Sequence, residues 1–184
     1  MKMIVYIGSR GVKGRTAQAG IALLEGFQEG GGSGEVFFLP HLNIERCRQC
    51  EDSGWGNCRE GRCCVEDDFP KLLEKAKEAE ILVFATPVYF GSLSESMRAF
   101  LDRLRRVSLH QEDGGISGKK VVGICVAGGG GGGAFDCSQE LNRILLTCRL
   151  NVLDVIPARR QNFDLKLEIL KLTGRWLATD HKEN

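Results

Sequence analysis

Short apolar runs alternate with amphipathic stretches along most of the chain, and this alternation limits the fold more than any other feature. Five runs are expected to be strands: residues 3–7, 36–39, 81–86, 120–127 and 152–156. Five stretches with apolar residues at helical spacing are expected to be helices: residues 16–28, 69–79, 94–109, 135–149 and 165–178. Strands that alternate with helices predict an α/β protein with a mostly parallel sheet covered on both faces.

Length and charge limit the kinds of protein this chain can be. Its 184 residues suffice for one sizeable core, and we expect a single domain over residues 1–184. The formal net charge is only +1, which leaves no overall field to attract nucleic acid or an anionic membrane. No apolar run approaches the roughly 20 residues that span a bilayer. The first run reaches Gly8 too soon for a signal peptide, so we expect a cytoplasmic protein without nucleic-acid or membrane partners.

The segment that follows the first predicted strand, residues 8–16, is rich in small, hydroxyl and cationic residues. Its glycines let backbone N–H groups close on an anion, Ser9 and Thr16 add hydroxyl donors, and the following helix adds a partial positive charge. Three side chains can add full charges: Arg10, Lys13 and Arg15. The segment predicts a phosphate site, although a plain glycine-rich turn is the alternative. It lacks both the Gly-Lys-Ser/Thr ending of a P-loop and the G-x-G-x-x-G spacing.

Two other segments would lie at the same edge of the sheet, where the carboxyl ends of parallel strands meet and ligands bind. Residues 86–94 read Thr-Pro-Val-Tyr-Phe-Gly-Ser-Leu-Ser, and the rings of Tyr89 and Phe90 suit a planar heteroaromatic ligand. Residues 128–133 are six consecutive glycines, which satisfy G-x-G-x-x-G trivially, with Asp154 about 20 residues further on. A nicotinamide dinucleotide site is therefore one alternative. A flexible loop beside a ring system is the better interpretation, and an idle loop is the third.

Residues 41–66 fit neither the helical nor the strand period and contain five of the eight cysteines. The spacing is C-x2-C-x7-C-x4-C over Cys47, Cys50, Cys58 and Cys63, with Cys64 directly following. Cysteines that stay reduced favour metal or redox chemistry over disulfides. Four thiolates can hold a [4Fe–4S] cluster or a tetrahedral zinc ion, and a segment without metal is the third alternative. The other cysteines are expected to be buried as small apolar side chains: Cys125, Cys137 and Cys148.

Three stretches carry a resemblance to a known family: Gly8-Ser9 with Gly14-Arg15-Thr16, Gly61-Arg62-Cys63 with Asp67-Asp68, and residues 86–94 with 97–103. They are similar to the flavodoxin-like NADPH-dependent FMN reductases and, more narrowly, to the iron–sulfur flavoproteins. The resemblance extends over residues 1 to about 135 and implies a flavodoxin-like three-layer sandwich. Its five-stranded parallel sheet would have the order 2-1-3-4-5.

The resemblance also implies the roles of particular residues. The FMN phosphate would be held by Ser9, Arg10, Lys13, Gly14, Arg15 and Thr16. The isoalloxazine ring would be wrapped by Pro87, Val88, Tyr89, Phe90, Gly91 and Ser92, with Gly128, Gly129 and Gly130 along its other edge. The cluster ligands would be Cys47, Cys50, Cys58 and Cys63, although this chain has extra residues, 51–57, before the third cysteine.

The function expected from these residues is that of an FMN-dependent oxidoreductase with a [4Fe–4S] cluster. It would move electrons between NAD(P)H or ferredoxin and a small acceptor, and it would assemble as a homodimer or homotetramer. The alternatives are a cluster-free NAD(P)H-dependent FMN or quinone reductase and a non-catalytic electron carrier. No nucleophile–base pair or paired carboxylates are recognised, so no catalytic side chain is expected.

Several remaining residues have expected roles away from the chemistry. The histidines are expected to be surface or structural residues: His41, His110 and His181. Three arginines are expected to form a basic patch, either a solvated face or a rim for an oligomer contact, a nicotinamide phosphate or an acidic ferredoxin: Arg103, Arg105 and Arg106. Trp55 could shield a cluster, contact a neighbouring subunit or lie at an exposed loop tip.

Overall fold

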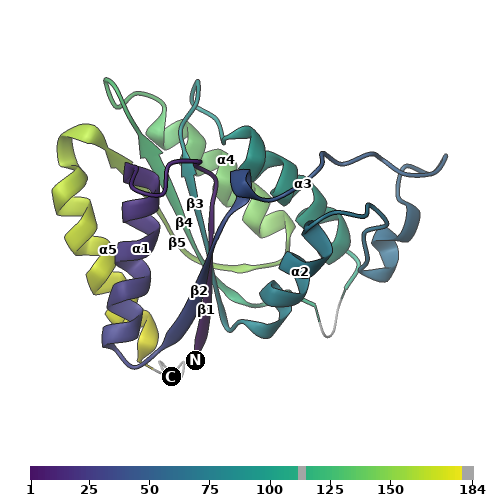
Figure 1. Ribbon diagram of the computed structural model, residues 1–184, viewed down its shortest axis with the longest axis horizontal. Coiled ribbons are helices and arrows are strands. Elements are labelled where there is room, and N and C mark those ends of the chain that lie inside the picture. Colours follow the sequence, from purple (N-terminus) through teal and green to yellow (C-terminus); the bar gives the residue numbers. More distant parts are fainter. Residues whose placement is uncertain (112–114, 180–184) are drawn as a thin grey trace.

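Five parallel strands form one sheet in the order β2-β1-β3-β4-β5, in a computed structural model that describes residues 1–111 and 115–179 (Figure 1). The strands are β1 (Lys2–Ile7), β2 (Ser33–Phe38), β3 (Ile81–Pro87), β4 (Lys120–Ala127) and β5 (Asn151–Arg159). The central strand β3 is buried along its whole length. This burial explains its continuous apolar sequence, because both faces of the sheet are covered. The predicted fold class and strand order are confirmed.

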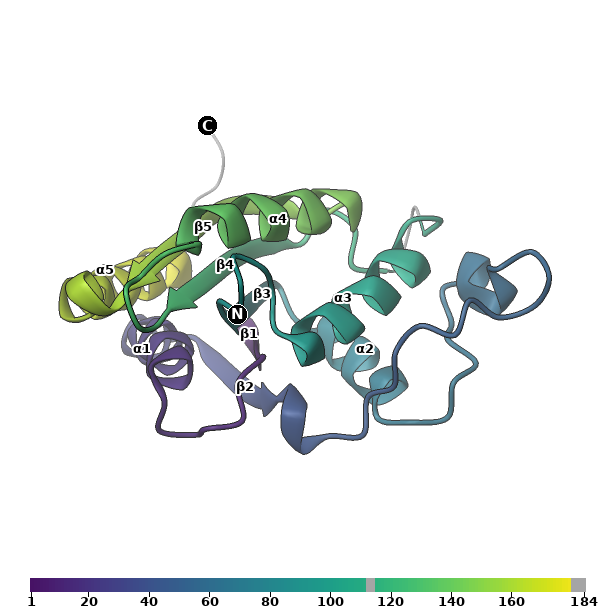
Figure 2. The ribbon, with the colours of Figure 1, turned by 90° about the horizontal axis from the view of Figure 1, so that it is seen from above.

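The helices form two layers on opposite faces of the sheet (Figure 2). One layer contains α1 (Arg15–Glu29) and α5 (Phe163–Ala178). The other contains α2 (Phe69–Glu78), α3 (Glu95–Ser108) and α4 (Ala134–Thr147). Gly26 and Gly174 let α1 and α5 cross closely, since a Cβ at either position would lie within 2.1 Å of a backbone oxygen of the other helix. None of the described helices is long and apolar enough to cross a bilayer.

Some predicted element ends are wrong by a few residues, and proline accounts for two of them. Leu39 does not end a strand but opens a 3-10 turn, Leu39–His41, since Pro40 cannot donate to a strand ladder. The fifth strand continues to Arg159 through Pro157, which an edge strand tolerates. Ser94 caps α3, because its Oγ accepts a hydrogen bond from the Met97 N–H. Asp68 makes no side-chain cap, and Asp67 instead accepts from the Phe69 N–H at 3.0 Å.

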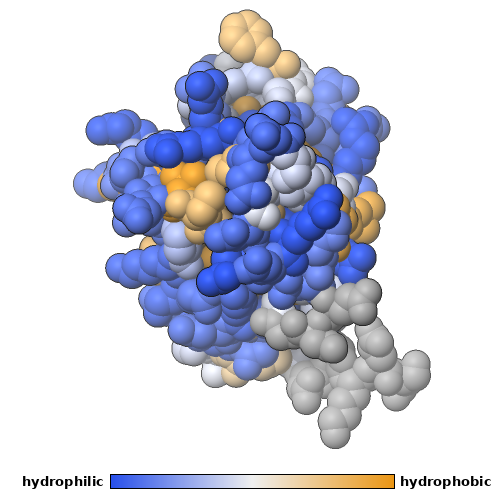
Figure 3. Space-filling view, turned by 90° about the vertical axis from the view of Figure 1, so that its right-hand side faces the viewer, coloured by the Kyte–Doolittle hydropathy of each residue, from blue (hydrophilic) through white to orange (hydrophobic). Residues whose placement is uncertain are grey.

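The segment between β2 and α2 extends beyond α2 and α3 to one end of the molecule (Figures 1 and 2). Its regular structure is limited to Leu39–His41 and a second 3-10 turn, Gly56–Glu60, within the described residues. The surface at this end is mostly hydrophilic, with a small hydrophobic area among the charged side chains (Figure 3). The predicted irregular segment is confirmed, and its five cysteines lie outside the strands of the sheet.

Candidate functional site

The loops after β1, β3 and β4 begin side by side at the carboxyl edge of the sheet. The Gly8 N–H donates to the Ala85 carbonyl at 2.8 Å, and the Val88 N–H donates to the Val126 carbonyl at 3.0 Å. Ser96 of α3 adds a contact between the layers, because its Oγ donates to the Gly8 carbonyl at 3.2 Å. The fold thus brings together the three segments selected from the sequence.

The first loop contains a buried hydroxyl that nothing in the described part of the chain satisfies. The Oγ atom of Ser9 is inaccessible and has no hydrogen-bond partner there. A tight turn follows, in which the Gly14 N–H donates to the Gly11 carbonyl at 3.0 Å, and α1 begins at Arg15. The three cations of this loop are exposed, and none pairs with a described carboxylate: Arg10, Lys13 and Arg15. An orphan hydroxyl, unpaired cations and a helix N-terminus together suit a phosphate group.

Two hollows flank Tyr89 at this edge. The first, of about 390 Å³, is lined by residues of all three loops: Arg15, Thr16, Pro87, Val88, Tyr89, Gly128, Gly129 and Gly132. The second, of about 570 Å³, is also lined by Tyr89 and includes Gly8, Arg10, Pro40, Phe90 and Leu93. Volumes in this range are typical of small-molecule sites. Gly130 and Gly91 are sequence neighbours of lining residues, but neither of them lines a hollow.

A strained turn presents the aromatic side chains. Tyr89 and Ser92 exchange backbone hydrogen bonds of 3.0 and 2.9 Å, and the two residues between them have positive φ angles of 52° for Phe90 and 76° for Gly91. These angles define a type I′ turn, which glycine adopts freely and phenylalanine does not. The Phe90 side chain is nevertheless fully exposed. Strain together with an exposed ring is typical of a ligand-contacting loop.

Glu140 of α4 fixes this turn, and sequence analysis missed it. Its Oε2 atom accepts hydrogen bonds from the Ser92 hydroxyl at 2.7 Å and from the Leu93 N–H at 3.2 Å. Its other oxygen pairs with Arg98. A carboxylate 48 residues beyond Ser92 gives no local signal, so only the fold reveals the contact.

Replacing Glu140 with glutamine is expected to weaken binding of a ligand at the aromatic turn by roughly 3- to 10-fold. The amide keeps the shape but loses the charge that holds Arg98 and Ser92, about 1 kcal/mol of interaction. The measurement is the dissociation constant of FMN in a fluorescence titration. Gln139→Ala, at the exposed neighbouring position, is the matched control. Equal affinity in all three proteins would contradict the role given to Glu140.

The glycine run forms an open turn rather than a dinucleotide fingerprint. A Cβ at Gly128, Gly129 or Gly130 would meet nothing within 4 Å, so the backbone there is open to a ligand. Gly133 is different, because a Cβ there would lie 2.6 Å from the Gly91 Cα, and this contact joins the two loops. The acidic residue of the nicotinamide alternative, Asp154, pairs in register with Val122, well before the end of β4. The position of Asp154 therefore gives no support to that alternative.

The histidines take the structural roles that were expected, as far as the structure describes them. His41 Nε2 lies 2.9 Å from the Arg10 carbonyl oxygen and so ties the first loop to the turn after β2. His110 packs edge-on against Trp55, with ring centroids 4.9 Å apart. His181 lies outside the described residues.

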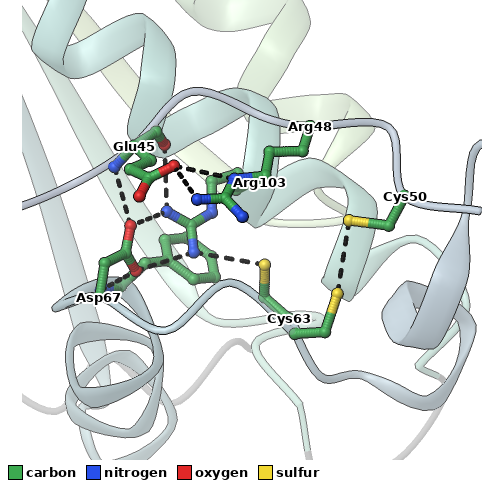
Figure 4. A network of polar contacts seen from close by, with 8 residues as sticks. Glu45, Arg48, Cys50, Cys63, Asp67 and Arg103 are labelled. Atoms are coloured by element: carbon green, nitrogen blue, oxygen red, sulfur yellow. Dashed lines mark hydrogen bonds and ion pairs between the residues drawn. The ribbon is translucent and has the colours of Figure 1, made fainter.

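Two cysteines of the irregular segment lie close together, and two others make separate contacts. Cys64 and Cys50 have their Sγ atoms 3.4 Å apart (Figure 4), whereas the Cys63 Sγ accepts a hydrogen bond from Arg103 at 3.3 Å. Cys58 is buried, and burial raises the pKa of its thiol although Arg106 opposes that rise. In the described part of the chain, no three His, Cys, Asp or Glu side chains are arranged as a metal site. The remaining cysteines are buried as expected: Cys125, Cys137 and Cys148.

A buried ion pair anchors this segment to α3. Arg103 is 1% exposed and Asp67 is 0% exposed, and Nη1 and Nη2 of the arginine bind the two carboxylate oxygens at 2.5 and 2.9 Å (Figure 4). Arg103 also donates to the Glu45 carbonyl at 3.1 Å and stacks on the Phe69 ring. The expected basic patch is therefore wrong for Arg103, which is inside the protein. Burial raises the pKa of Asp67, but hydrogen bonds from Arg103, Glu45 N–H and Phe69 N–H outweigh it and hold the pKa below its usual value.

Asp67→Asn is expected to lower the free energy of unfolding by roughly 3–5 kcal/mol at neutral pH, because it leaves the guanidinium buried without its partner. Since the pKa of Asp67 is lower when folded, its contribution is present above the unfolded pKa, about 4, and is lost as pH falls through the folded value. Urea unfolding should therefore show a smaller difference in the free energy of unfolding between Asp67→Asn and wild type at pH 3 than at pH 7. Asp68→Asn, which replaces the carboxylate that accepts from the exposed Asn43 N–H with a neutral amide, should cost only about 1 kcal/mol. Equal losses in the two variants would contradict this account.

The chain is similar in sequence to known flavoproteins. The NADPH-dependent FMN reductase family matches residues 1–161. An iron–sulfur flavoprotein of Methanocaldococcus jannaschii is 30% identical over 149 residues, which cover 79% of this chain and 72% of that protein. One of Archaeoglobus fulgidus is 35% identical over 75 residues, so the match spans 41% of the chain and about a third (35%) of that relative's length.

Solved structures agree in fold. An NAD(P)H:quinone oxidoreductase from Methanothermobacter marburgensis superposes with a TM-score of 0.72 at 21% identity, covering 100% of this chain and 99% of that one. A flavodoxin from the domain Archaea superposes with a TM-score of 0.64 at 16% identity, covering 97% of this chain and 96% of that one. At these identities the likeness concerns the arrangement of strands and helices.

Proposed function

The chain belongs to the NADPH-dependent FMN reductase family, and from this premise we propose an FMN-dependent oxidoreductase that carries a [4Fe–4S] cluster. It would move electrons between NAD(P)H or ferredoxin and a small acceptor. The single observation that carries the flavin part is the meeting of three loops around two hollows, with an unsatisfied buried hydroxyl at Ser9.

The three loops carry groups that suit both parts of FMN, the phosphate and the ring. The phosphate would lie in the first loop, held by backbone N–H groups and by the side chains of Ser9, Arg10, Lys13, Arg15 and Thr16. The ring would lie between the segment from Pro87 to Ser92 and the open backbone of Gly128 to Gly130. When bound, FMN supplies hydride and electron transfer, so the protein needs to position the ring rather than provide an acid or base.

The turn from Tyr89 to Ser92 would orient the ring and limit its contact with water. Tyr89 lines both hollows, and the exposed Phe90 offers apolar surface beside the second. Glu140 keeps the turn in one conformation, which would hold the backbone amides in place beside the ring. Preorganised donors of this kind tune the electron affinity of a bound cofactor.

The cluster would be held by Cys47, Cys50, Cys58 and Cys63, and the thiol chemistry of the segment suits it. Arg103 supports Cys63 as a ligand, since N–H donors commonly bind metal-ligating sulfur. The contact between Cys50 and Cys64 favours a second candidate, a cluster-free NAD(P)H-dependent reductase whose segment carries a thiol pair or zinc. Iron content separates the two.

We infer a homodimer or homotetramer from the separation between the cysteine segment and the three loops. The segment extends to one end of the molecule, whereas the loops lie at the carboxyl edge of the sheet (Figures 1 and 2). A partner subunit could bring its cysteines to the flavin of the first, with a small molecule or ferredoxin as the external redox partner.

Turnover of the FMN-loaded protein tests the oxidoreductase. NADH or NADPH oxidation would be followed anaerobically with a quinone or a ferric complex as acceptor, and flavin-free protein would be the control. The proposal expects acceptor-dependent oxidation that requires bound FMN. Tight FMN binding without any NAD(P)H oxidation would indicate a non-catalytic electron carrier instead.

A further inference from the structure

Arg106 lies one helical turn beyond Arg103 on α3 and faces the same cysteine segment. Arg103 has its charge compensated by Asp67, which is as buried as the arginine. Arg106 has no such partner, because no ion pair among the described residues involves it. Its Nε and Nη2 atoms are inaccessible and have no hydrogen-bond acceptor in the described ranges.

A guanidinium stays protonated in proteins, so Arg106 cannot relieve this situation by losing its proton. Arg106 is partly buried, and two of its three guanidinium nitrogens are inaccessible donors without acceptors in the described ranges, which destabilises this position. The position of Arg106 therefore calls for an anion or an acceptor group close by. Two other arginines of this region are already compensated, since Arg48 pairs with Glu45 and Arg62 with Glu60.

The indole of Trp55 stacks on the guanidinium. The Arg106 Cζ lies 4.3 Å from the centroid of the indole, which is itself held edge-on by His110. The indole comes from residues 51–57, the extra residues before the third cysteine. Cation–π stacking holds the guanidinium in place, and the exclusion of water strengthens its electrostatic field at neighbouring groups.

The 3-10 turn that carries Cys58, Gly56–Glu60, lies next to the same guanidinium. Arg106 interacts with the Cys58 thiol, and Gln111, just after α3, donates to the Arg59 carbonyl at 3.4 Å and ties the turn to the helix. A cluster bound by four thiolates carries net negative charge and accepts hydrogen bonds at its sulfurs. It would supply both the charge and the acceptors that Arg106 lacks.

We propose that Arg106, stacked under Trp55, is the charge-compensating residue of the cluster and raises its reduction potential. The inference rests on the proposed [4Fe–4S] cluster. Reduction adds one negative charge to the cluster, so a fixed cation beside it favours the reduced form. Arg103 contributes less to the potential, because Asp67 neutralises it.

The test is a spectroelectrochemical titration of the cluster in the purified holoprotein, followed by its electron paramagnetic resonance signal. Arg106→Gln should lower the equilibrium constant for one-electron reduction at least tenfold, a shift of 59 mV to more negative potential. Arg106→Lys, which keeps the charge, should restore most of it. Arg62→Gln, which removes an exposed arginine beside Cys63, should leave the potential unchanged.

A wild-type potential in cluster-loaded Arg106→Gln overturns the inference and leaves the proposed function intact. Absence of iron from the wild-type protein overturns both. If Arg106→Gln purifies without iron, Trp55→Leu decides, because it keeps the charge and admits water around it. A shift in the same direction that is smaller than tenfold supports the inference, and an unchanged potential overturns it.

Discussion

Replacing Cys63 with serine is expected to remove the iron from the protein, whereas replacing the adjacent Cys64 leaves it in place. Cys63 is anchored by Arg103, whose guanidinium is fixed in turn by Asp67 and Glu45, so its sulfur has a defined position (Figure 4). Cys64 is exposed. Adjacent residues rarely direct both side chains to one small cluster, and a serine oxygen replaces a thiolate poorly as an iron ligand.

Iron and sulfide per FMN in the two anaerobically purified variants are the measurement. Loss of nearly all iron in Cys63→Ser with full FMN content is the expected result, because the flavin loops lie away from the cysteine segment (Figure 2). The competing ligand is Cys64, since its Sγ lies 3.4 Å from that of Cys50. Iron retained by Cys63→Ser and lost by Cys64→Ser would move the fourth ligand to Cys64.

Ser9→Ala is expected to weaken FMN binding by roughly 10- to 100-fold and yet leave the flavin-free protein as stable as before, or slightly more stable. A hydrogen bond to a charged phosphate contributes about 1.5–3 kcal/mol, which the alanine variant loses. In the flavin-free protein the Ser9 Oγ is buried without a partner in the described part of the chain, so its removal costs little. Weaker FMN binding without a loss of stability is expected only if the Ser9 hydroxyl contacts the ligand.

The check combines an FMN fluorescence titration with urea unfolding of the flavin-free protein. Ser33→Ala, at an exposed serine at the start of β2, controls for the loss of a hydroxyl and should change neither quantity. A variant that binds FMN as tightly as wild type would place the phosphate elsewhere. One that loses stability and affinity together would make Ser9 a structural residue.

The fold could be predicted because local sequence and burial agree along the sheet. β3 is apolar over residues 81–86 because it is buried on both faces, and the pattern needs no knowledge of its neighbours. The three loops followed from topology alone, since parallel strands place their carboxyl ends at one edge. Strand ends beside Pro40 and Pro157 were misjudged, because only the fold distinguishes an edge strand from a central one.

The contacts that fix the site could not be predicted, because they join residues far apart in sequence. Glu140 is 48 positions from Ser92, and Arg103 is 36 positions from Asp67. For Arg103 one signal was present and was not used. It follows Phe100 by three residues and precedes Val107 by four, so its helical position belongs to the buried face of α3. A charged residue at such a position indicates a buried partner.

The cysteine segment shows a different limit. Its spacing fits an iron–sulfur cluster, zinc or free thiols, and the spacing of thiols does not choose among them. Its path depends on contacts with α3, such as Trp55 on Arg106, rather than on any local period. The metal content of the segment has to be measured, because iron–sulfur clusters and zinc are both bound by cysteine thiolates.

The most direct measurement is an absorption spectrum of the anaerobically purified protein, with iron, sulfide and zinc determined per FMN. The account predicts flavin bands above a broad absorbance near 400 nm, with about four irons and four sulfides per FMN. FMN without iron would contradict the cluster and leave a flavin reductase with a thiol or zinc segment. A protein that binds no flavin even after incubation with FMN would contradict the assignment of all three loops at the sheet edge.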